Sequence, residues 1–269
     1  MLSTVATLSL VTLLGAMFVL WLVSLRLRDA SIVDPFWGVA FAIIAAIGHG
    51  LGHGRPERRL LVLVLVAVWA VRLSGYLLLR RGHGEDHRYA AMRQRHGVRF
   101  WWLSGLMVFG LQACLALAVS MPLLAAATRG GTRPLGLLDV VGGGLWLAGL
   151  LCEAIADVQL ARFKRAPESR GQVMARGLWR YSRHPNYFGE FLLWWGLGLI
   201  GLGAGVAWAL LGPALLTVLL LRVSGVTLLE AALRERRPAY VDYIRRTSAF
   251  IPWPPRKRPP GVDSISEPR

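Results

Sequence analysis

Long apolar segments alternate with short polar ones along most of this chain. Roughly 17–25 apolar residues are needed for a helix to cross the hydrocarbon core of a bilayer. Seven segments reach about that length, near residues 4–25, 31–48, 59–80, 102–125, 136–158, 187–203 and 206–230. Backbone polar groups in lipid must be satisfied within their own segment, so each segment is predicted to be a helix. The last two segments are joined by the sequence GLGAG, and they are expected to form a hairpin.

This pattern predicts an all-α integral membrane protein with seven transmembrane helices. The helices would form a single domain over residues 1–255, followed by a flexible basic and polar tail over residues 256–269, which is rich in proline and charge. The N-terminal segment lacks both a basic leading region and a small-residue cleavage site, so it is interpreted as the first span and not as a removable signal.

The composition agrees with a membrane protein. Hydrophobic residues make up 55% of the chain and charged residues 17%, and the mean hydropathy of +0.48 lies far from that of an ordinary soluble domain. The two cysteines, Cys114 and Cys152, both fall in apolar segments. They therefore predict neither a disulfide framework nor a thiolate metal site.

Basic residues are distributed unequally between the loops. If the N-terminus lies outside, 24 of the 31 Lys and Arg residues fall on the inner side and only five on the outer side. This asymmetry predicts that the long loops and the C-terminus face the cytoplasm. The formal charge of +16 is then explained by topology and by anionic lipid headgroups, and no nucleic-acid partner is needed.

Several ionisable residues lie within or beside the predicted spans, where each costs a few kcal/mol unless it is paired or hydrated. They are Asp34, Arg72, Glu153, Asp157, Glu190, Arg222 and Glu230. Glu153 and Asp157 are four residues apart and share one helix face, with Lys164 nearly on the same stripe. Two interpretations remain open: a buried ion-pair lattice that holds helices together, or a functional site.

The stretch RYSRHPNYFGE, residues 180–190, gathers polar groups directly before an apolar segment. Pro185 suits the first turn of a helix, which would place Asn186 and Glu190 one turn apart on one face. Arginines and the amides of a helix start attract anions, so a phosphate-bearing ligand entering from the cytoplasm is one interpretation. The other is a belt of Trp, Tyr and Arg anchors at the membrane interface.

The motif GLWRYSRHPNYFGEFLLWWG resembles the C-terminal region of the steroid 5α-reductase family, particularly its bacterial DUF1295-type members. The similarity continues through EAIADVQLARFK and RRPAYVDYIRRTSAFIPWPP, and it covers residues 140–255 well. SIVDPFWG and RLSGYLLLRRGHGEDHRY extend it more weakly into the first half. A similar Arg-His-Pro-x-Tyr element occurs in membrane methyltransferases of the isoprenylcysteine carboxyl methyltransferase type.

The resemblance implies a seven-helix enzyme that holds NADPH in a cavity open to the cytoplasm. By motif position it implies roles for Asp157, Lys164, Asn186, Glu190 and Arg222, and less directly for Arg72 and Tyr76. Together with the polar residues described above, the predicted cofactor-binding set is Arg72, Glu153, Asp157, Lys164, Arg176, Arg183, His184, Asn186, Tyr187, Glu190, Arg222 and Glu230. The chain departs from the animal enzymes at Glu153, which replaces an Asn, and at Glu230, which replaces a Tyr. RVSGV stands where those enzymes carry a His-rich patch.

The implied reaction is conjugate reduction of an enone, in which a hydride reaches the β-carbon while a donor stabilises the developing enolate. Asp34 in SIVDPFWG is the expected acid, because a carboxyl in an apolar pocket can stay protonated and donate. The alternative is that Asp34 only caps the helix that opens at Pro35. Tyr76 is the expected hydroxyl donor.

Three functions remain in view. The first is NADPH-dependent reduction of the 4,5 double bond of a 3-oxo-4-ene steroid or a related enone lipid. The second is an S-adenosylmethionine-dependent membrane methyltransferase, which is disfavoured because Glu230 is followed by alanine and not by a second glutamate. The third is a non-catalytic lipid-binding scaffold. The expected partners are a hydrophobic enone and membrane lipid, with no nucleic acid, no metal and no obligate protein partner, and the expected location is a bacterial inner membrane.

Overall fold

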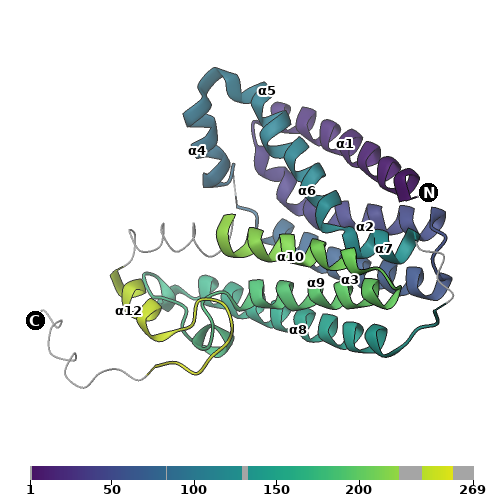
Figure 1. Ribbon diagram of the computed structural model, residues 1–269. Helices are drawn as coiled ribbons and strands as arrows, with labels where there is room; N and C mark the ends of the chain where they lie inside the picture. Colours follow the sequence, from purple (N-terminus) through teal and green to yellow (C-terminus); the bar gives the residue numbers. More distant parts are fainter. Residues whose placement is uncertain (1, 83, 129–132, 224–237, 257–269) are drawn as a thin grey trace, which may run out of the picture. The chain divides into compact units, whose positions relative to one another are not determined.

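The computed structural model describes residues 2–82, 84–128, 133–223 and 238–256. Within these ranges the regular structure is helical, and one isolated β-bridge joins Ser182 to Ser248. The α-helices are α1 (Leu2–Leu27), α2 (Val33–Leu51), α3 (Pro56–Arg80), α4 (His87–His96), α5 (Phe100–Ser104), α6 (Leu111–Val119), α7 (Met121–Thr128), α8 (Leu137–Arg165), α9 (Pro185–Gly203), α10 (Leu211–Val218) and α12 (Pro238–Arg246) (Figure 1). The prediction of an all-helical chain is confirmed for the part that the structure describes.

Five helical stretches in the described part of the chain are long and apolar enough to cross a membrane. They are Leu2–Leu27, Ala30–Leu51, Pro56–Arg80, His87–Val119 and Leu137–Arg165, and Ala207–Arg222 is a shorter apolar helix. These stretches are consistent with a membrane protein. The predicted count of seven spans and the orientation of the termini stay predictions, and residues 224–230 of the seventh predicted segment lie outside the described residues.

The segment predicted as one span over residues 102–125 is divided. A π-helical turn, η3 (Gly105–Gly110), separates α5 from α6. Helix α6 ends at Val119, and the hydroxyl of the next residue, Ser120, donates to the carbonyl of Ala116 at 2.7 Å. Pro122 follows at the start of α7, where its missing N–H is tolerated. A further helix, α4, lies in the basic segment that the hydropathy pattern assigns to a loop. Its first turn is capped by Asp86, which accepts from the backbone N–H of Arg88 at 2.9 Å.

The contacts divide the chain into two compact units. Unit 1 comprises Met1–Trp146 and Trp194–Leu216, and unit 2 comprises Leu147–Leu193 and Thr217–Arg269. Helices α8 and α9 each contribute one part to unit 1 and the other part to unit 2.

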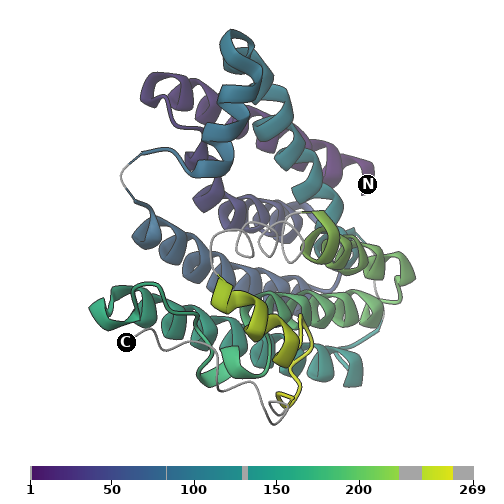
Figure 2. The same ribbon diagram turned by 90° about the vertical axis from the view of Figure 1, so that its left-hand side faces the viewer.

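The core of unit 1 lies between α2, α3 and the second part of α9. Helix α2 packs along α3 (Figure 2). A Cβ at Gly38 would lie 3.0 Å from the Cα of Ala70, so a larger residue there would push the two helices apart. Trp69 and Trp194 meet edge to face at 5.5 Å and are both fully buried. This geometry is the one that aromatic pairs prefer.

A buried ion pair ties the start of α3 to the start of α8 in unit 1. The Nε of Arg58 lies 2.7 Å from Oδ1 of Asp139, and the two side chains are 1% and 4% exposed. The guanidinium also donates to the carbonyl of Pro134 at 3.1 Å. Because its hydrogen bonds are shared between a carboxylate and a backbone carbonyl, the buried charge is compensated, and losing one partner alone would be costly.

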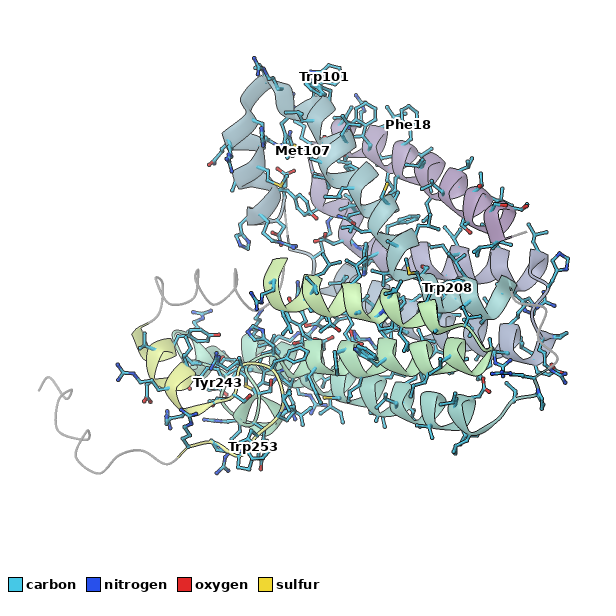
Figure 3. All side chains as sticks on the ribbon, in the orientation of Figure 1. Phe18, Trp101, Met107, Trp208, Tyr243 and Trp253 are labelled. Carbon is cyan, nitrogen blue, oxygen red and sulfur yellow. The ribbon has the colours of Figure 1, made fainter. Side chains whose placement is uncertain are left out.

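Apolar side chains cover the outside of the long helices. Phe18 is 56% exposed, Trp101 58% and Met107 42%, and Figure 3 shows Phe18 and Trp101 on the outer surface of unit 1. In water such a surface would favour association. In a bilayer it faces acyl chains, which agrees with the hydropathy of the same helices.

Helices α8 and α9 run antiparallel in close contact because glycines face each other along the pair (Figure 1). In unit 1, a Cβ at Gly142 would lie 2.6 Å from the carbonyl oxygen of Gly196. In unit 2, a Cβ at Gly149 would lie 2.5 Å from the carbonyl oxygen of Gly189. On each helix the two glycines are seven residues apart, which is two turns, so both lie on the same face of that helix. Small residues at such positions let membrane helices approach backbone to backbone.

Candidate functional site

The glycine contacts bring the acidic face of α8 against the first turns of α9 in unit 2. The side-chain amide of Asn186 donates to Oδ1 of Asp157 at 3.3 Å. Glu153, one turn earlier on α8, lies against Gly189, whose added Cβ would be 2.6 Å from the Glu153 backbone nitrogen. Glu153 is 3% exposed and Asp157 4%, whereas Asn186 and Glu190 are half-buried. The structure therefore brings Asn186 to Asp157, with Glu153 one turn away on α8 and Glu190 one turn further along α9.

The start of α9 is fixed by local hydrogen bonds. The helix begins at Pro185, as predicted, and the hydroxyl of Ser182 accepts from the backbone N–H of His184 at 3.1 Å. His184 is buried, and its ring stacks on that of Tyr187 at 5.5 Å between centroids. This stacking orients both aromatic side chains at the helix entrance.

A short 3-10 turn before α9, Gly177–Arg180, is attached to α8. The indole N–H of Trp179 donates to the carbonyl of Ala156 at 3.0 Å. The backbone N–H of Leu178 donates to the side chain of Gln159, also at 3.0 Å. Because Ala156 directly precedes Asp157, these hydrogen bonds fix the position of the turn relative to the acidic face of α8.

The C-terminal segment, residues 247–256, is hydrogen-bonded to the same loop. The sequence pattern did not indicate this contact. The backbone N–H of Arg183 donates to the carbonyl of Ser248 at 2.9 Å, and the hydroxyl of Ser182 donates to the carbonyl of Phe250 at 2.7 Å. Phe250 packs edge to face against Phe188 of α9 at 5.7 Å. These contacts brace the residues that precede Asn186.

Arg183 has a structural contact in addition to its predicted role. Its guanidinium donates to the carbonyl of Ile244 at 2.9 Å and to that of Thr247, at the end of α12. A helix end leaves carbonyls without intrahelical partners, and a cationic side chain satisfies them well. Arg183 is only 8% exposed, so its guanidinium caps α12 from inside the fold.

The remaining predicted cofactor residues of unit 2 lie at its surface or outside the described ranges. Lys164 is exposed in the last turn of α8, and Arg176 is exposed in the loop before the 3-10 turn. Arg222 is exposed in the π-helical turn Leu219–Val223. Glu230 lies outside the described residues.

In unit 1, Asp34 faces a polar cluster and not the apolar pocket expected from the sequence. Its Oδ1 accepts from the hydroxyl of Tyr89 at 2.6 Å, and its Oδ2 accepts from the guanidinium of Arg88 at 2.7 Å. Gln112 of α6 approaches the same hydroxyl at 3.5 Å. Tyr89 and Arg88 both lie in α4. The hydropathy pattern did not predict this helix because the segment is too polar, and for the same reason it did not predict these two partners of Asp34.

A second polar cluster, centred on Asp29, holds the junction between α1 and α2. The Asp29 carboxylate accepts from the backbone N–H of Ser31 at 2.8 Å and forms an ion pair with Arg81. Partial burial acts to raise the pKa of Asp29, but the hydrogen bonds from Ser31 and Arg81 outweigh it and hold that pKa below its ordinary value. Glu85 accepts from the backbone N–H of Ala30 at 2.8 Å. The segment after α3 is thus fastened to the residues between α1 and α2.

The other two residues predicted in unit 1 lie on α3. Arg72 and Tyr76 are half-buried and one turn apart, so they share a face of the helix. The guanidinium of Arg80 lies over the Tyr76 ring at 5.6 Å from its centroid, a cation–π contact one turn further along.

These features define the chain as an all-helical protein with several membrane-length helices and buried carboxylates paired with amide and hydroxyl donors. The chain matches the family described as "Protein of unknown function (DUF1295)" over residues 20–247. It therefore belongs to the DUF1295 family, which is related to the steroid 5α-reductases.

Two relatives illustrate this placement. An uncharacterized protein of Schizosaccharomyces pombe is 28% identical over 267 residues, covering 87% of this chain and 76% of the yeast protein. The enzyme 3-oxo-5-alpha-steroid 4-dehydrogenase 1 of Macaca fascicularis is 32% identical over 75 residues, covering 28% of this chain and 26% of the enzyme. No solved structure matches the chain.

Proposed function

We propose that this protein is a membrane-embedded, NADPH-dependent oxidoreductase that reduces the 4,5 double bond of a 3-oxo-4-ene steroid or a related enone lipid. The observation that carries the proposal is the buried contact of Asp157 with Asn186, beside Glu153, on the glycine-packed pair α8 and α9. These residues belong to the part of the chain whose motifs resemble the steroid 5α-reductases. Membership of a family related to those enzymes supports the same reaction class.

The residues of unit 2 fit a phosphorylated dinucleotide. Asp157 and Glu190 can accept hydrogen bonds from ribose hydroxyls or a carboxamide, and the amide of Asn186 can both donate and accept. Lys164 and Arg176 are both exposed in unit 2, and either can supply a cation to the phosphates. When bound, NADPH would supply the hydride. The protein's part is to orient the acceptor and to exclude water.

In unit 1, the proposed hydrogen-bond donor to the substrate carbonyl is the hydroxyl of Tyr89, which Asp34 orients. The distance of 2.6 Å between Oδ1 of Asp34 and the Tyr89 hydroxyl oxygen places one hydrogen between them. When a carbonyl oxygen approaches, a phenol held in this way can turn its hydrogen toward the developing negative charge. Arg88 stabilises the carboxylate that remains. Tyr76 stays the alternative hydroxyl proposed from the sequence.

The protein is also proposed to lie in a bacterial inner membrane with seven spans, its N-terminus outside and its C-terminus and cofactor entrance toward the cytoplasm. A hydrophobic enone would then enter from lipid and NADPH from water. The excess of Lys and Arg in the loops assigned to the inner side supports this orientation.

Product analysis tests the reaction. Purified protein in detergent is incubated with progesterone or testosterone and NADPH, and in parallel with S-adenosylmethionine. A gain of two hydrogens by mass spectrometry, with matching consumption of NADPH, is the expected result. A gain of a methyl group would establish the methyltransferase instead, and no product from several enone lipids would leave only a binding protein.

Cofactor selectivity gives a second measurement on the same preparation. The 2′-phosphate of NADPH adds up to two negative charges, which suits the arginine-rich side of the protein. NADPH is expected to bind at least about tenfold more tightly than NADH, a difference of about 1.4 kcal/mol. Equal dissociation constants for NADPH and NADH would refute a dedicated phosphate pocket.

A further inference from the structure

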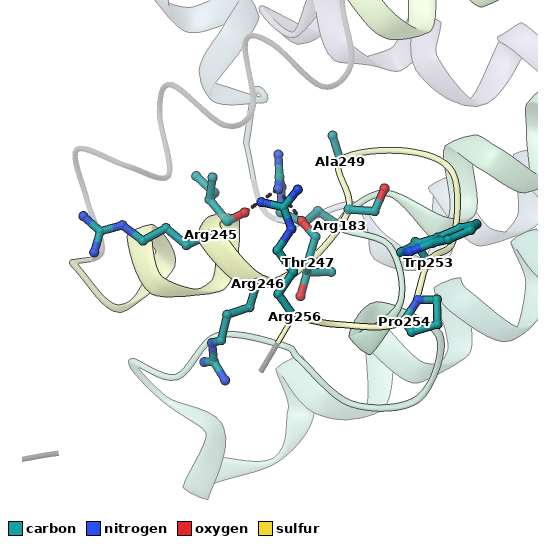
Figure 4. Close-up of a pocket in the computed structure, with 10 residues that line it drawn as sticks. Arg183, Arg245, Arg246, Thr247, Ala249, Trp253, Pro254 and Arg256 are labelled. Atoms are coloured by element: carbon teal, nitrogen blue, oxygen red, sulfur yellow. Dashed lines mark hydrogen bonds between the residues drawn. The ribbon is translucent and has the colours of Figure 1, made fainter. Parts of the chain in front are cut away.

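The C-terminal part of unit 2 encloses a pocket that no step of the proposed reaction uses. Its volume is about 410 Å³, and it is lined by Arg183, residues 244–249, Trp253, Pro254 and Arg256. Figure 4 shows α12 on one side of this pocket and the indole of Trp253 on the other. The volume is ample for a phosphate group with the glycerol attached to it.

The walls of the pocket are held in place by backbone hydrogen bonds. The N–H of Arg256 donates to the carbonyl of Arg246 at 2.9 Å, which closes the C-terminal segment back onto the end of α12. The N–H of Trp253 donates to the carbonyl of Tyr181, also at 2.9 Å. Because these bonds use main-chain atoms, the side chains of Trp253 and Arg256 are available to contact a ligand without loss of the fold.

The pocket is strongly cationic. Four of its ten lining residues are arginines, and none is acidic. The neighbouring Asp242 lies 2.5 Å from the guanidinium of Arg246, which is its i,i+4 partner on α12. Among the residues that the structure describes, Arg245 and Arg256 form no ion pair, and both are exposed. The pocket therefore carries an excess of positive charge that an anion would neutralise.

Large exposed apolar side chains lie on the segment that carries Arg256, and one of them, Trp253, lines the pocket. Trp253 is 68% exposed and Ile251 is 62% exposed, on the segment that carries Arg256. Aromatic and basic residues side by side are typical of the membrane–water interface, where the rings sit at headgroup level and the cations meet anionic lipids. A soluble anion would gain nothing from these exposed apolar side chains, whereas the glycerol and acyl chains of a phospholipid would contact them.

We propose that this pocket binds the phosphate group of an anionic phospholipid, with Arg245 and Arg256 contacting the phosphate and Trp253 contacting the glycerol and upper acyl chain. The bound lipid would fasten α12 and the C-terminal segment to the membrane surface. Since that segment braces the start of α9 through Ser182 and Arg183, lipid binding would also stabilise the loop before Asn186. The proposal does not depend on the chemistry assigned to the protein.

The test is a binding titration of the full-length protein in neutral detergent, followed by native mass spectrometry and by thermal unfolding. The probes are dioctanoyl phosphatidylglycerol, dioctanoyl phosphatidylcholine, inorganic phosphate and NADPH. The double variant Arg245→Gln, Arg256→Gln removes two exposed charges from the pocket. The matched control, Arg162→Gln, Arg165→Gln, removes two exposed charges from the end of α8 in the same unit.

Phosphatidylglycerol is expected to bind and to raise the melting temperature, and the pocket variant should weaken its binding by at least about tenfold. The control pair should change it by less than about threefold. Trp253→Ala should lower the affinity for phosphatidylglycerol while leaving that for inorganic phosphate unchanged. Equal binding of phosphatidylcholine would overturn the proposal, as would equal losses in the pocket and control variants. Inorganic phosphate or NADPH displacing the lipid at similar concentration would assign the pocket to a soluble anion instead.

Discussion

The hydroxyl of Tyr89 is the group in unit 1 whose surroundings bear most directly on the proposed reaction. It is buried, it lies 2.6 Å from Asp34, and the side chain of Gln112 is also within reach. Tyr76, on α3, is half-buried and has Arg80 over its ring. The carboxylate holds the Tyr89 hydroxyl in one orientation, and the guanidinium of Arg88 offsets the negative charge of that carboxylate.

Removing single hydroxyls separates the two tyrosines. Tyr89→Phe is expected to lower the turnover of an enone steroid by roughly 10²-fold, because a donor at the developing oxyanion is lost. Tyr76→Phe serves as the matched control and should change turnover only a few-fold. The measurement is single-turnover hydride transfer at saturating NADPH, with the dissociation constant of NADPH determined separately. If Tyr76→Phe shows the larger loss, Tyr76 is the donor and the pair of Asp34 and Tyr89 is structural.

Asn186 is the polar residue of α9 that reaches the buried Asp157. Asn186→Ala should weaken NADPH binding by at least about tenfold, about 1.4 kcal/mol, because one side chain then loses its contacts to the cofactor and to Asp157. The experiment is isothermal titration with NADPH. Gln94→Ala, which removes an exposed amide from α4, is the control and should leave the affinity unchanged. If Asn186→Ala and Glu190→Ala both kept wild-type affinity and turnover, residues 180–190 would serve only as an anchor at the membrane interface.

At the scale of elements, the decisive feature is the approach of α8 to α9 through glycine. A Cβ at Gly149 would lie 2.5 Å from both the Gly189 carbonyl oxygen and the Leu193 backbone nitrogen. These are backbone atoms, so neither can move aside without shifting a helix. The distance between the acidic face of α8 and Asn186 therefore depends on residues that carry no functional group.

Alanine at this contact should destabilise the protein. Gly149→Ala is expected to lower the unfolding free energy by about 1–3 kcal/mol, the usual range for overpacking, and to impair NADPH binding as well. Gly143→Ala is the control, because nothing lies within 4 Å of its added Cβ. Alanine there should be neutral or slightly stabilising. Thermal unfolding in one detergent compares the two, and equal melting temperatures would show that the helices separate without penalty.

At the scale of the whole molecule, the prediction concerns which side of the membrane each loop faces. The residues around His53 lie in a loop assigned to the outside, and the basic segment around Arg95 lies in one assigned to the cytoplasm. In a variant lacking Cys114 and Cys152, a single cysteine is introduced by His53→Cys or by Arg95→Cys. Both positions are exposed in the structure.

A membrane-impermeant maleimide should label the first variant in intact cells and the second only after the membrane is opened. Labelling follows directly from access of the reagent to the thiol, so it measures topology independently of activity. Labelling of the Arg95→Cys protein in intact cells would reverse the proposed orientation and place the arginine-rich loops outside.

Local patterns in the sequence were sufficient for much of this description. Runs of apolar residues predicted the long helices, because burial in lipid depends on the hydropathy of each segment alone. Pro185 predicted the start of α9, and the i,i+4 spacing of Glu153 and Asp157 predicted their common face. Membership of the DUF1295 family agrees with the resemblance of the motifs after residue 140.

Contacts between distant segments were decided only by the tertiary structure. Asp34 is expected to stand in an apolar pocket, yet α4, more than 50 residues later, supplies Arg88 and Tyr89 as its partners. The sequence predicts that Arg183 binds an anion, yet its guanidinium caps the end of α12, about 60 residues further along the chain. Hydropathy and helical periodicity report on neighbours within one element. A buried charge needs a hydrogen-bond partner, because leaving it unpaired in a low-dielectric interior is costly. Which residue becomes that partner depends on how distant elements pack against each other.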